Sequence, residues 1–212
     1  MSKSYLIIIC IFLSACGIKP ISQLVRNDFT LRFEGRNTEL TEKIRIDGYY
    51  VTKVQSTSNK TLDMNMILFK DGTFAKSFYI PKTTENDTRT FFGENFHNEA
   101  SYWGIYQLNG DTIITQYISR TSWMAPWDSR EEWFFIIDSI SLQSIFAKPI
   151  GFEVSQELLE SRWHNRDRFS PSLFVPTDTL PPSDNWLKEE KWLWRNEKDW
   201  EEYMKRKRVH RK

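Results

Sequence analysis

The side chains that most often carry covalent or metal chemistry are scarce in this sequence. It contains two cysteines and three histidines among 212 residues. Cys10 lies inside the apolar run Leu6–Leu13, and Cys16 follows that run among small residues. A thiolate can act as a nucleophile, as a metal ligand or as half of a disulfide. Two cysteines cannot build a disulfide framework, which excludes the small disulfide-rich secreted proteins.

The three histidines do not assemble a recognisable site. His97 lies between Glu94 and Glu99, an arrangement that is either a metal or acid–base cluster or an ordinary solvated loop. The second interpretation is favoured, because metal sites need several converging ligands. His164 has arginines on both sides, which disfavours a cation nearby, and His210 lies in a basic tail.

Familiar catalytic motifs are also missing from the sequence. It has no glycine-rich phosphate loop, no His-Glu-x-x-His and no Gly-x-Ser-x-Gly. We therefore predict no catalytic residues, no metal, no cofactor and no enzymatic activity. Carboxylates are plentiful, so a hydrolase with an unmarked pair of acids stays open as an alternative.

The first fifteen residues have the pattern of a secretory signal. A short segment with Lys3 is followed by the uncharged run Leu6–Leu13 and then by small residues. The run is too short to span the bilayer, which takes about 20 apolar residues. We expect residues 1–15 to be a signal peptide and residues 16–28 to form the mature N-terminus and a tether.

Leu13-Ser14-Ala15-Cys16 resembles the lipobox of bacterial lipoproteins. In that family the chain is cut before the cysteine, which is lipidated. The resemblance implies that Cys16 anchors the protein in the membrane and that the mature chain has no free thiol. The alternatives are an ordinary signal peptide or a buried N-terminal segment. No aspartate follows Cys16, which by resemblance to lipoprotein sorting patterns favours the outer membrane, on its periplasmic face.

Composition narrows the class of protein further. Hydrophobic residues make up 40% of the chain, which excludes a wholly disordered protein. Lys plus Arg is 29 and Asp plus Glu is 28, so no global charge attracts nucleic acid. We expect a membrane partner but no nucleic-acid partner.

Residues 29–150 show the pattern of an antiparallel β domain. Runs rich in β-branched and aromatic residues are separated by turn signals, and Asp71-Gly72 and Asn109-Gly110 are strong hairpin signals. We predict eight strands, at residues 30–34, 44–54, 64–70, 73–80, 102–108, 111–119, 132–140 and 142–146. Both faces carry apolar residues, which favours a small up-and-down barrel or curled sheet with an outer cover.

Cross-strand faces follow if both turns are two-residue loops. In the first hairpin this places Met64, Met66 and Leu68 with Ala75, Ser77 and Tyr79, and it places Phe74 and Lys76 with Asn65, Ile67 and Phe69. In the second hairpin one face holds Trp103, Ile105, Ile114 and Ile118, and the other holds Tyr102, Tyr106, Ile113 and Tyr117. The connection Pro81–Glu99 is either a lid or a loop packed on the core, and packing is favoured.

The C-terminal third changes character. Residues 151–182 are predicted as a short helix at 155–168 followed by a linker that is stiff because it contains several prolines. Residues 183–212 are predicted as one amphipathic helix to Arg208 with a basic tail. Its candidate partner or membrane face consists of Trp186, Leu193, Trp194, Trp200 and Met204. Packing on the barrel or on a partner is favoured over a membrane interface or sugar contact.

Gly48-Tyr49-Tyr50, Leu68–Phe74, Trp103–Asp111 and Trp133–Ile137 are similar to the rhythm of small lipocalin-like lipoproteins of Gram-negative envelopes. The resemblance implies a barrel that holds a small apolar ligand. Candidate ligand-facing or core aromatics are Tyr50, Phe69, Trp103, Tyr106 and Phe135. We expect a lipid-anchored, non-enzymatic protein that binds such a ligand or an envelope partner. The alternative is a structural or interaction lipoprotein with a filled core, whose Trp-rich C-terminal helix docks a partner or membrane surface.

Overall fold

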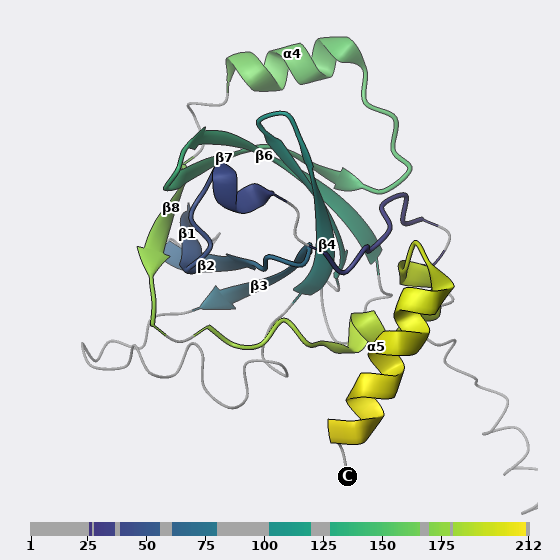
Figure 1. Ribbon diagram of the computed structural model, residues 1–212. Coiled ribbons are helices and arrows are strands. Elements are labelled where there is room, and N and C mark those ends of the chain that lie inside the picture. The colour runs from purple at the N-terminus through teal and green to yellow at the C-terminus, as the bar shows by residue number, and fades with distance from the viewer. Residues whose placement is uncertain are drawn as a thin grey trace, which may run out of the picture.

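The protein folds around a closed antiparallel β-barrel (Figure 1). The computed structural model describes residues 26, 28–36, 39–55, 61–79, 102–119, 128–165, 170–178 and 180–210. Each strand pairs with the next, and β8 pairs back onto β1, which confirms the predicted up-and-down barrel. The strands are β1 Gly48–Gln55, β2 Thr61–Leu68, β3 Thr73–Tyr79, β4 Tyr102–Asn109, β5 Thr112–Ser119, β6 Asp128–Asp138, β7 Ser141–Pro149 and β8 Ser172–Pro176.

The helical elements lie at one end of the barrel and around it. They are the 3-10 turns η1 Leu40–Glu42, η3 Trp186–Glu189 and η4 Lys191–Leu193, and the α-helices α4 Gln156–His164 and α5 Glu197–His210. Helix α4 lies within the predicted 155–168, and Ser155 caps it by accepting a hydrogen bond from the Leu158 N–H at 3.2 Å. No helix in the part of the chain that the structure describes is long and apolar enough to cross a membrane.

The eighth strand corrects the predicted domain boundary. Strand β8 lies inside the segment predicted as a linker, and it closes the barrel by pairing with β1 and β7. Its prolines are compatible with this role because Pro171 precedes the strand and Pro176 ends it. Residues 30–34, predicted as a strand, instead form a single bridge between Phe33 and Trp194. The barrel therefore extends past residue 150.

The register of the first hairpin differs from the prediction. The Phe69 N–H donates to the Thr73 carbonyl at 2.9 Å, so the loop has three residues rather than two. Gly72 has a φ of 94°, and Asp71 accepts hydrogen bonds from the Thr73 N–H and hydroxyl. A shift of one residue exchanges the two faces of a strand. Phe74 and Lys76 therefore share a face with Met66 and Leu68.

The second hairpin keeps its predicted faces. Asn109 pairs with Thr112, two positions from the predicted register, and an even shift leaves each side chain on the same face. The Tyr102, Tyr106, Ile113 and Tyr117 face points into the barrel, and the Trp103, Ile105, Ile114 and Ile118 face points outward.

The predicted long C-terminal helix is wrong in its first half. Residues 186–193 form two 3-10 turns separated by Glu190, whose backbone is extended, and α5 begins only at Glu197. The reason is tertiary packing. Leu187, Leu193 and Trp194 are buried against Ile105 and Ile118 on the outer wall, together with Phe29 and Phe33. The C-terminal segment thus covers the barrel, as predicted.

Candidate ligand site inside the barrel

One half of the barrel lumen is filled by apolar side chains. The turn η1 lies across this end (Figure 1), where Leu40 is fully buried and Ile44 is 3% exposed. Behind it, inward-facing residues from seven strands pack into one cluster, which contains Tyr50, Met66, Leu68, Phe74, Tyr106, Ile113, Tyr117, Phe134, Ile136 and Leu142. This end, where the β2–β3, β4–β5 and β6–β7 turns meet, is therefore closed by protein.

Polar side chains occupy the next level of the lumen. We call them the polar belt, and its members are Thr52, Lys76, Thr115, Glu132, Ser144 and Ser172. Each of the six lies two residues along its strand from a member of the apolar cluster or pairs with such a member on the neighbouring strand. Residues related in either way lie on the same face of the sheet, so all six side chains point inward. Thr52 Oγ1 and Ser172 Oγ are hydrogen-bonded at 2.5 Å. The lumen therefore changes from apolar to polar along its axis.

An ion pair forms the centre of the polar belt. The Lys76 ammonium donates to the Glu132 carboxylate, and the two side chains are only 6% and 7% exposed. Ser144 Oγ donates to Glu132 Oε1 at 3.2 Å. The Lys76 Nζ lies 5.4 Å from the ring centroid of Tyr117 and 5.8 Å from that of Phe134, which adds cation–π attraction.

A buried ion pair needs a physical explanation. Removing two charges from water costs free energy that their attraction repays only when the geometry is good, and apolar residues of similar volume often stabilise a protein as well or better. Such pairs are therefore more informative about specificity or function than about stability. Here the pair supplies the charged donor and acceptor groups of the polar belt, next to the apolar cluster.

Aromatic side chains continue the lumen beyond the ion pair. The rings of Tyr102 and Tyr117 lie 5.5 Å apart, and burial raises the pKa of both phenols. Arg130 is two residues before Glu132 on β6 and forms an ion pair with Asp128 at 2.8 Å. Asp128 and Arg130 lie at the end opposite η1, and the two tyrosine rings lie between them and the rest of the apolar cluster. Residues 56–60, 80–101 and 120–127 are outside the described residues, and with them the connection 81–99, for which a lid and a packed loop were the alternatives, and His97.

The five predicted ligand-facing or core aromatics are divided between the two sides of the barrel wall. Tyr50 and Tyr106 face the lumen, where their hydroxyls donate to the carbonyls of Arg45 at 2.9 Å and Phe69 at 2.6 Å. Phe69 and Trp103 stack outside the wall at 6.0 Å. Phe135 also points outward, against Trp163 of α4 at 4.8 Å. The two lumenal tyrosines thus tie the closed end together.

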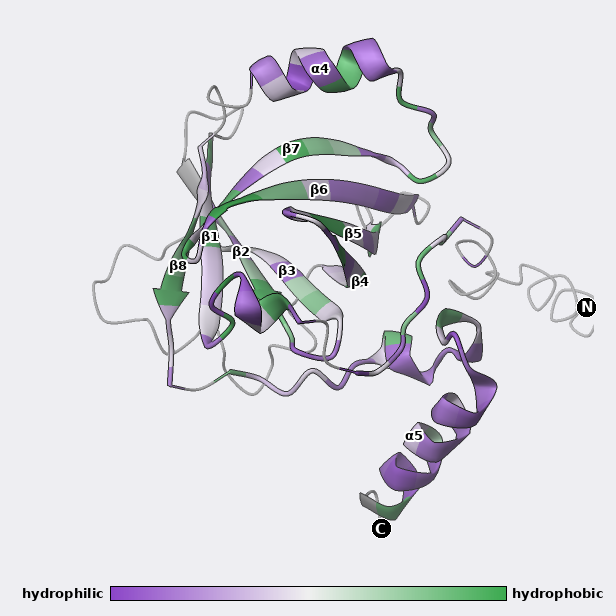
Figure 2. Ribbon diagram, turned by 45° about the horizontal axis from the view of Figure 1, so that its top comes forward, coloured by the Kyte–Doolittle hydropathy of each residue, from purple (hydrophilic) through white to green (hydrophobic). Residues whose placement is uncertain are grey.

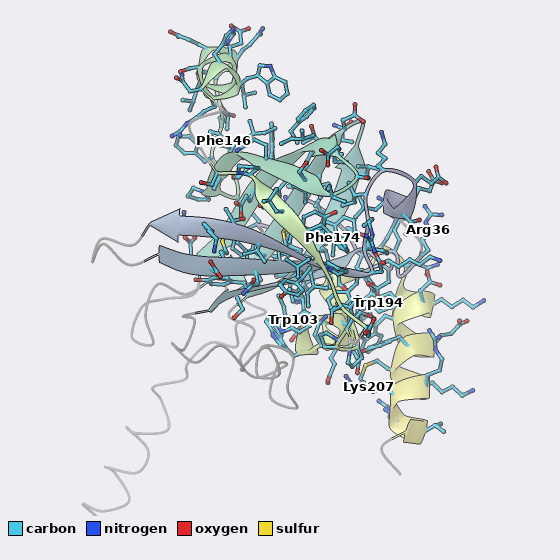
Figure 3. The ribbon with its side chains drawn as sticks, turned by 90° about the vertical axis from the view of Figure 1, so that its left-hand side faces the viewer. Arg36, Trp103, Phe146, Phe174, Trp194 and Lys207 are labelled. Atoms are coloured by element: carbon cyan, nitrogen blue, oxygen red, sulfur yellow. The ribbon has the colours of Figure 1, made fainter. Side chains whose placement is uncertain are left out.

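The predicted partner or membrane face is likewise divided. Leu193 and Trp194 are buried against the barrel, and the Trp194 indole donates to the Lys188 carbonyl at 2.9 Å. Trp200 and Met204 of α5 are partly buried, and Trp186 is 38% exposed. Figure 3 shows Trp194 against the barrel and Lys207 on the side of α5 near it. Packing on the barrel therefore accounts for Leu193, Trp194 and the Trp200 end of α5, but not for the C-terminal end of that helix.

Sequence reasoning missed the polar belt. A two-residue turn places Lys76 on the same face as Asn65, Ile67 and Phe69, whereas the observed three-residue turn places it with Met66 and Leu68. A sequence signal did exist: Lys76 interrupts Thr73–Tyr79, and Glu132 begins the apolar run of β6. A charged residue at an inward position of an otherwise apolar strand marks a buried charge that needs a partner.

No group of three or more potential metal-ligating side chains is found within the described ranges. The predicted lipidation site Cys16 lies outside them. No protein-family model matches the chain, and comparisons with curated proteins and with solved structures found no match.

Proposed function

We propose that this protein is a non-enzymatic envelope lipoprotein, anchored in the outer membrane through Cys16 on the periplasmic side, whose barrel binds a small, largely apolar ligand. The ligand enters at the end opposite η1, because η1 and the apolar cluster fill the other end. The observation that carries the proposal is the buried Lys76–Glu132 pair, which provides a polar attachment point at the base of an aromatic-walled lumen. Ligand sites commonly combine apolar walls with a few placed polar groups.

The chemistry of the lumen indicates how such a ligand is held. Its apolar body packs against Met64 and the Tyr102 and Tyr117 rings, and its single polar group exchanges hydrogen bonds with the polar belt. Lys76 has three N–H donors and Glu132 two acceptor oxygens, so the pair accommodates a group that donates, accepts or does both.

A filled-core interaction protein is the second candidate function. It is favoured by the packing of Met66, Phe74 and Phe134 in the lumen, which leaves the η1 half without space for a ligand. In this case the ion pair fixes the barrel's packing, and partners bind to the outer surface.

A fluorescent apolar anion, anilinonaphthalene sulfonate, distinguishes the two functions. We expect saturable binding at one site in the wild type and at least tenfold weaker binding in Lys76→Met/Glu132→Gln, which removes both charges together. The matched control is Lys53→Met/Asp63→Asn, because this ion pair lies on the outer wall at 3.0 Å. Equal binding by both double variants and the wild type contradicts the lumenal site and supports the filled core.

A further inference from the structure

The C-terminal half of α5 projects from the body of the protein. In Figures 1 and 2 the helix extends away from the barrel, and in Figure 3 the side chains on its outer side face no other element. Its attachment to the rest of the protein lies on one side only. The Lys207 Nζ contacts Asp184 and Glu189, each at 2.9 Å, and Tyr203 donates to Asp184. These contacts orient the opposite side of α5 outward.

The outward side combines positive charge with apolar surface. Lys205 and Arg208 are exposed on this side, and no acidic side chain in the described part of the chain forms an ion pair with either of them. A shallow groove of about 490 Å³ runs along the same side, lined by Trp200, Glu201, Met204, Lys205, Arg208 and Val209. Val209 is 67% exposed. Basic side chains around an apolar strip are typical of a helix that rests on an anionic bilayer surface.

The charge of α5 is unevenly distributed along its length. Its first half carries Glu197, Asp199, Glu201 and Glu202, whereas the second half carries four consecutive basic residues, Lys205 to Arg208. The sequence continues with Arg211 and Lys212. An anionic surface attracts the second half and repels the first, so the C-terminal end of the helix is the end that approaches it.

The position of the N-terminal segment brings this helix within reach of the lipid anchor. Arg26 lies beside η4 and the first residue of α5, in a hollow that it lines with Lys191, Trp192 and Glu197. Cys16 precedes Arg26 by ten residues, which span at most about 36 Å when fully extended. A chain anchored at Cys16 therefore keeps the start of α5 within that distance of the bilayer, and α5 itself is about 21 Å long.

We propose that the second half of α5 is a membrane-contact element. Lys205 and Arg208 bind anionic phospholipid headgroups, and Met204 and Val209 enter the headgroup boundary. This proposal rests on the proposed anchor at Cys16. The helix is a second attachment to the same membrane, and the helix and the anchor together fix the orientation of the barrel over the membrane. The binding partner of this helix side is a lipid surface and not one small ligand. Basic and apolar side chains alternate along the exposed side of the helix and do not point toward one common position.

Vesicle co-sedimentation tests the proposal separately from the anchor. All proteins are full-length and carry Cys16→Ser, so lipidation is absent, and binding is compared between phosphatidylcholine vesicles and vesicles with 30% phosphatidylglycerol. Each basic residue near an anionic surface contributes about 1 kcal/mol, so Lys205→Glu/Arg208→Glu is expected to lower the phosphatidylglycerol-dependent partition coefficient at least tenfold. The variant Lys205→Gln/Arg208→Gln, which adds no negative charge near the helix C-terminus, is expected to give a smaller loss.

The matched control is Lys70→Glu/Arg162→Glu, which makes the same change in net charge on other parts of the protein. It is expected to retain the wild-type preference for phosphatidylglycerol. A wild type with no such preference, or a control that loses as much as the α5 variant, overturns the proposal. Neither result bears on lipidation, which is measured independently by palmitate labelling.

Discussion

Lys76 on β3 and Glu132 on β6 form an ion pair through the barrel lumen, although β4 and β5 separate their strands in the sheet. The pair therefore crosses the interior and does not run along the wall. It joins the two halves of the barrel at the level where apolar packing ends. Any account of what this protein binds has to explain why two charges are buried there.

Loss of one member of the pair is expected to destabilise the protein strongly. Lys76→Met leaves the Glu132 carboxylate buried without its cation, which typically costs about 3–5 kcal/mol. Lys76→Met/Glu132→Gln leaves no uncompensated charge and is expected to be more stable than Lys76→Met alone. Urea denaturation of the single and double variants measures both values. A single variant as stable as wild type contradicts a buried pair.

The packing of the C-terminal segment predicts a large loss of stability at one residue and a small loss at its neighbour. Leu187 is fully buried in the outer-wall cluster, whereas Trp186 is 38% exposed. Leu187→Ala is expected to lower the free energy of unfolding by about 2–5 kcal/mol because it leaves a cavity. Trp186→Ala is expected to cost less than about 1 kcal/mol. Thermal denaturation compares them, and a reversed order contradicts the observed segment structure.

Stability is expected to depend on Asp71 at acid pH. Burial raises the pKa of this carboxyl, but the Lys188 ammonium and hydrogen bonds from Lys188, Thr73 and Ser183 outweigh burial and hold the pKa below its ordinary value of 3.8. The folded state therefore binds a proton at the Asp71 carboxyl less readily than the unfolded state does. The stabilisation is complete above the unfolded pKa and is lost as the pH falls through the lowered one.

Asp71→Asn tests this dependence. Below about pH 4 the wild type is expected to lose stability more steeply than the variant, because the variant has no carboxyl to protonate at this site. Denaturation midpoints measured between pH 7 and pH 2 give the two slopes. Parallel curves for the two proteins contradict an energetic role for the Asp71–Lys188 contact, whose two atoms are 2.6 Å apart.

Lipidation predicts a specific labelling result. Cells expressing the wild type are expected to incorporate labelled palmitate into the protein, and Cys16→Ser is expected to abolish the incorporation. Cys10→Ser is the control, because Cys10 belongs to residues 1–15, which are predicted to be removed as a signal peptide. Equal labelling of wild type and Cys16→Ser contradicts the anchor.

The sequence carried most of the information about the barrel and little about its lumen. Alternation in β4 and β5 predicted their faces correctly even though the register was displaced, because an even displacement preserves the faces. The length of the Lys70–Gly72 turn is harder to predict from the sequence. This length depends on the Asp71 side chain, which bonds to Thr73 and competes with a two-residue loop. That single residue decides whether Lys76 shares a face with Ile67 and Phe69 or with Met66 and Leu68.

Elements that depend on distant contacts were not predictable in the same way. Strand β8 is five residues long and flanked by prolines, so local pattern alone indicates a linker, and only the unpaired edges of β1 and β7 make it a strand. The 3-10 turns at 186–193 have a helical pattern, but burying Leu187, Leu193 and Trp194 on the barrel wall requires a different backbone. Tertiary packing overrides helix propensity in such segments.

Native mass spectrometry of the mature protein released from its own envelope tests the central claim most directly. The account predicts a wild-type protein that retains one small molecule at a one-to-one ratio, a loss of that mass in Lys76→Met/Glu132→Gln, and its retention in Lys53→Met/Asp63→Asn. A wild type that carries no bound molecule in gentle conditions, while remaining folded, contradicts lumenal binding. So does a bound mass that both double variants retain equally.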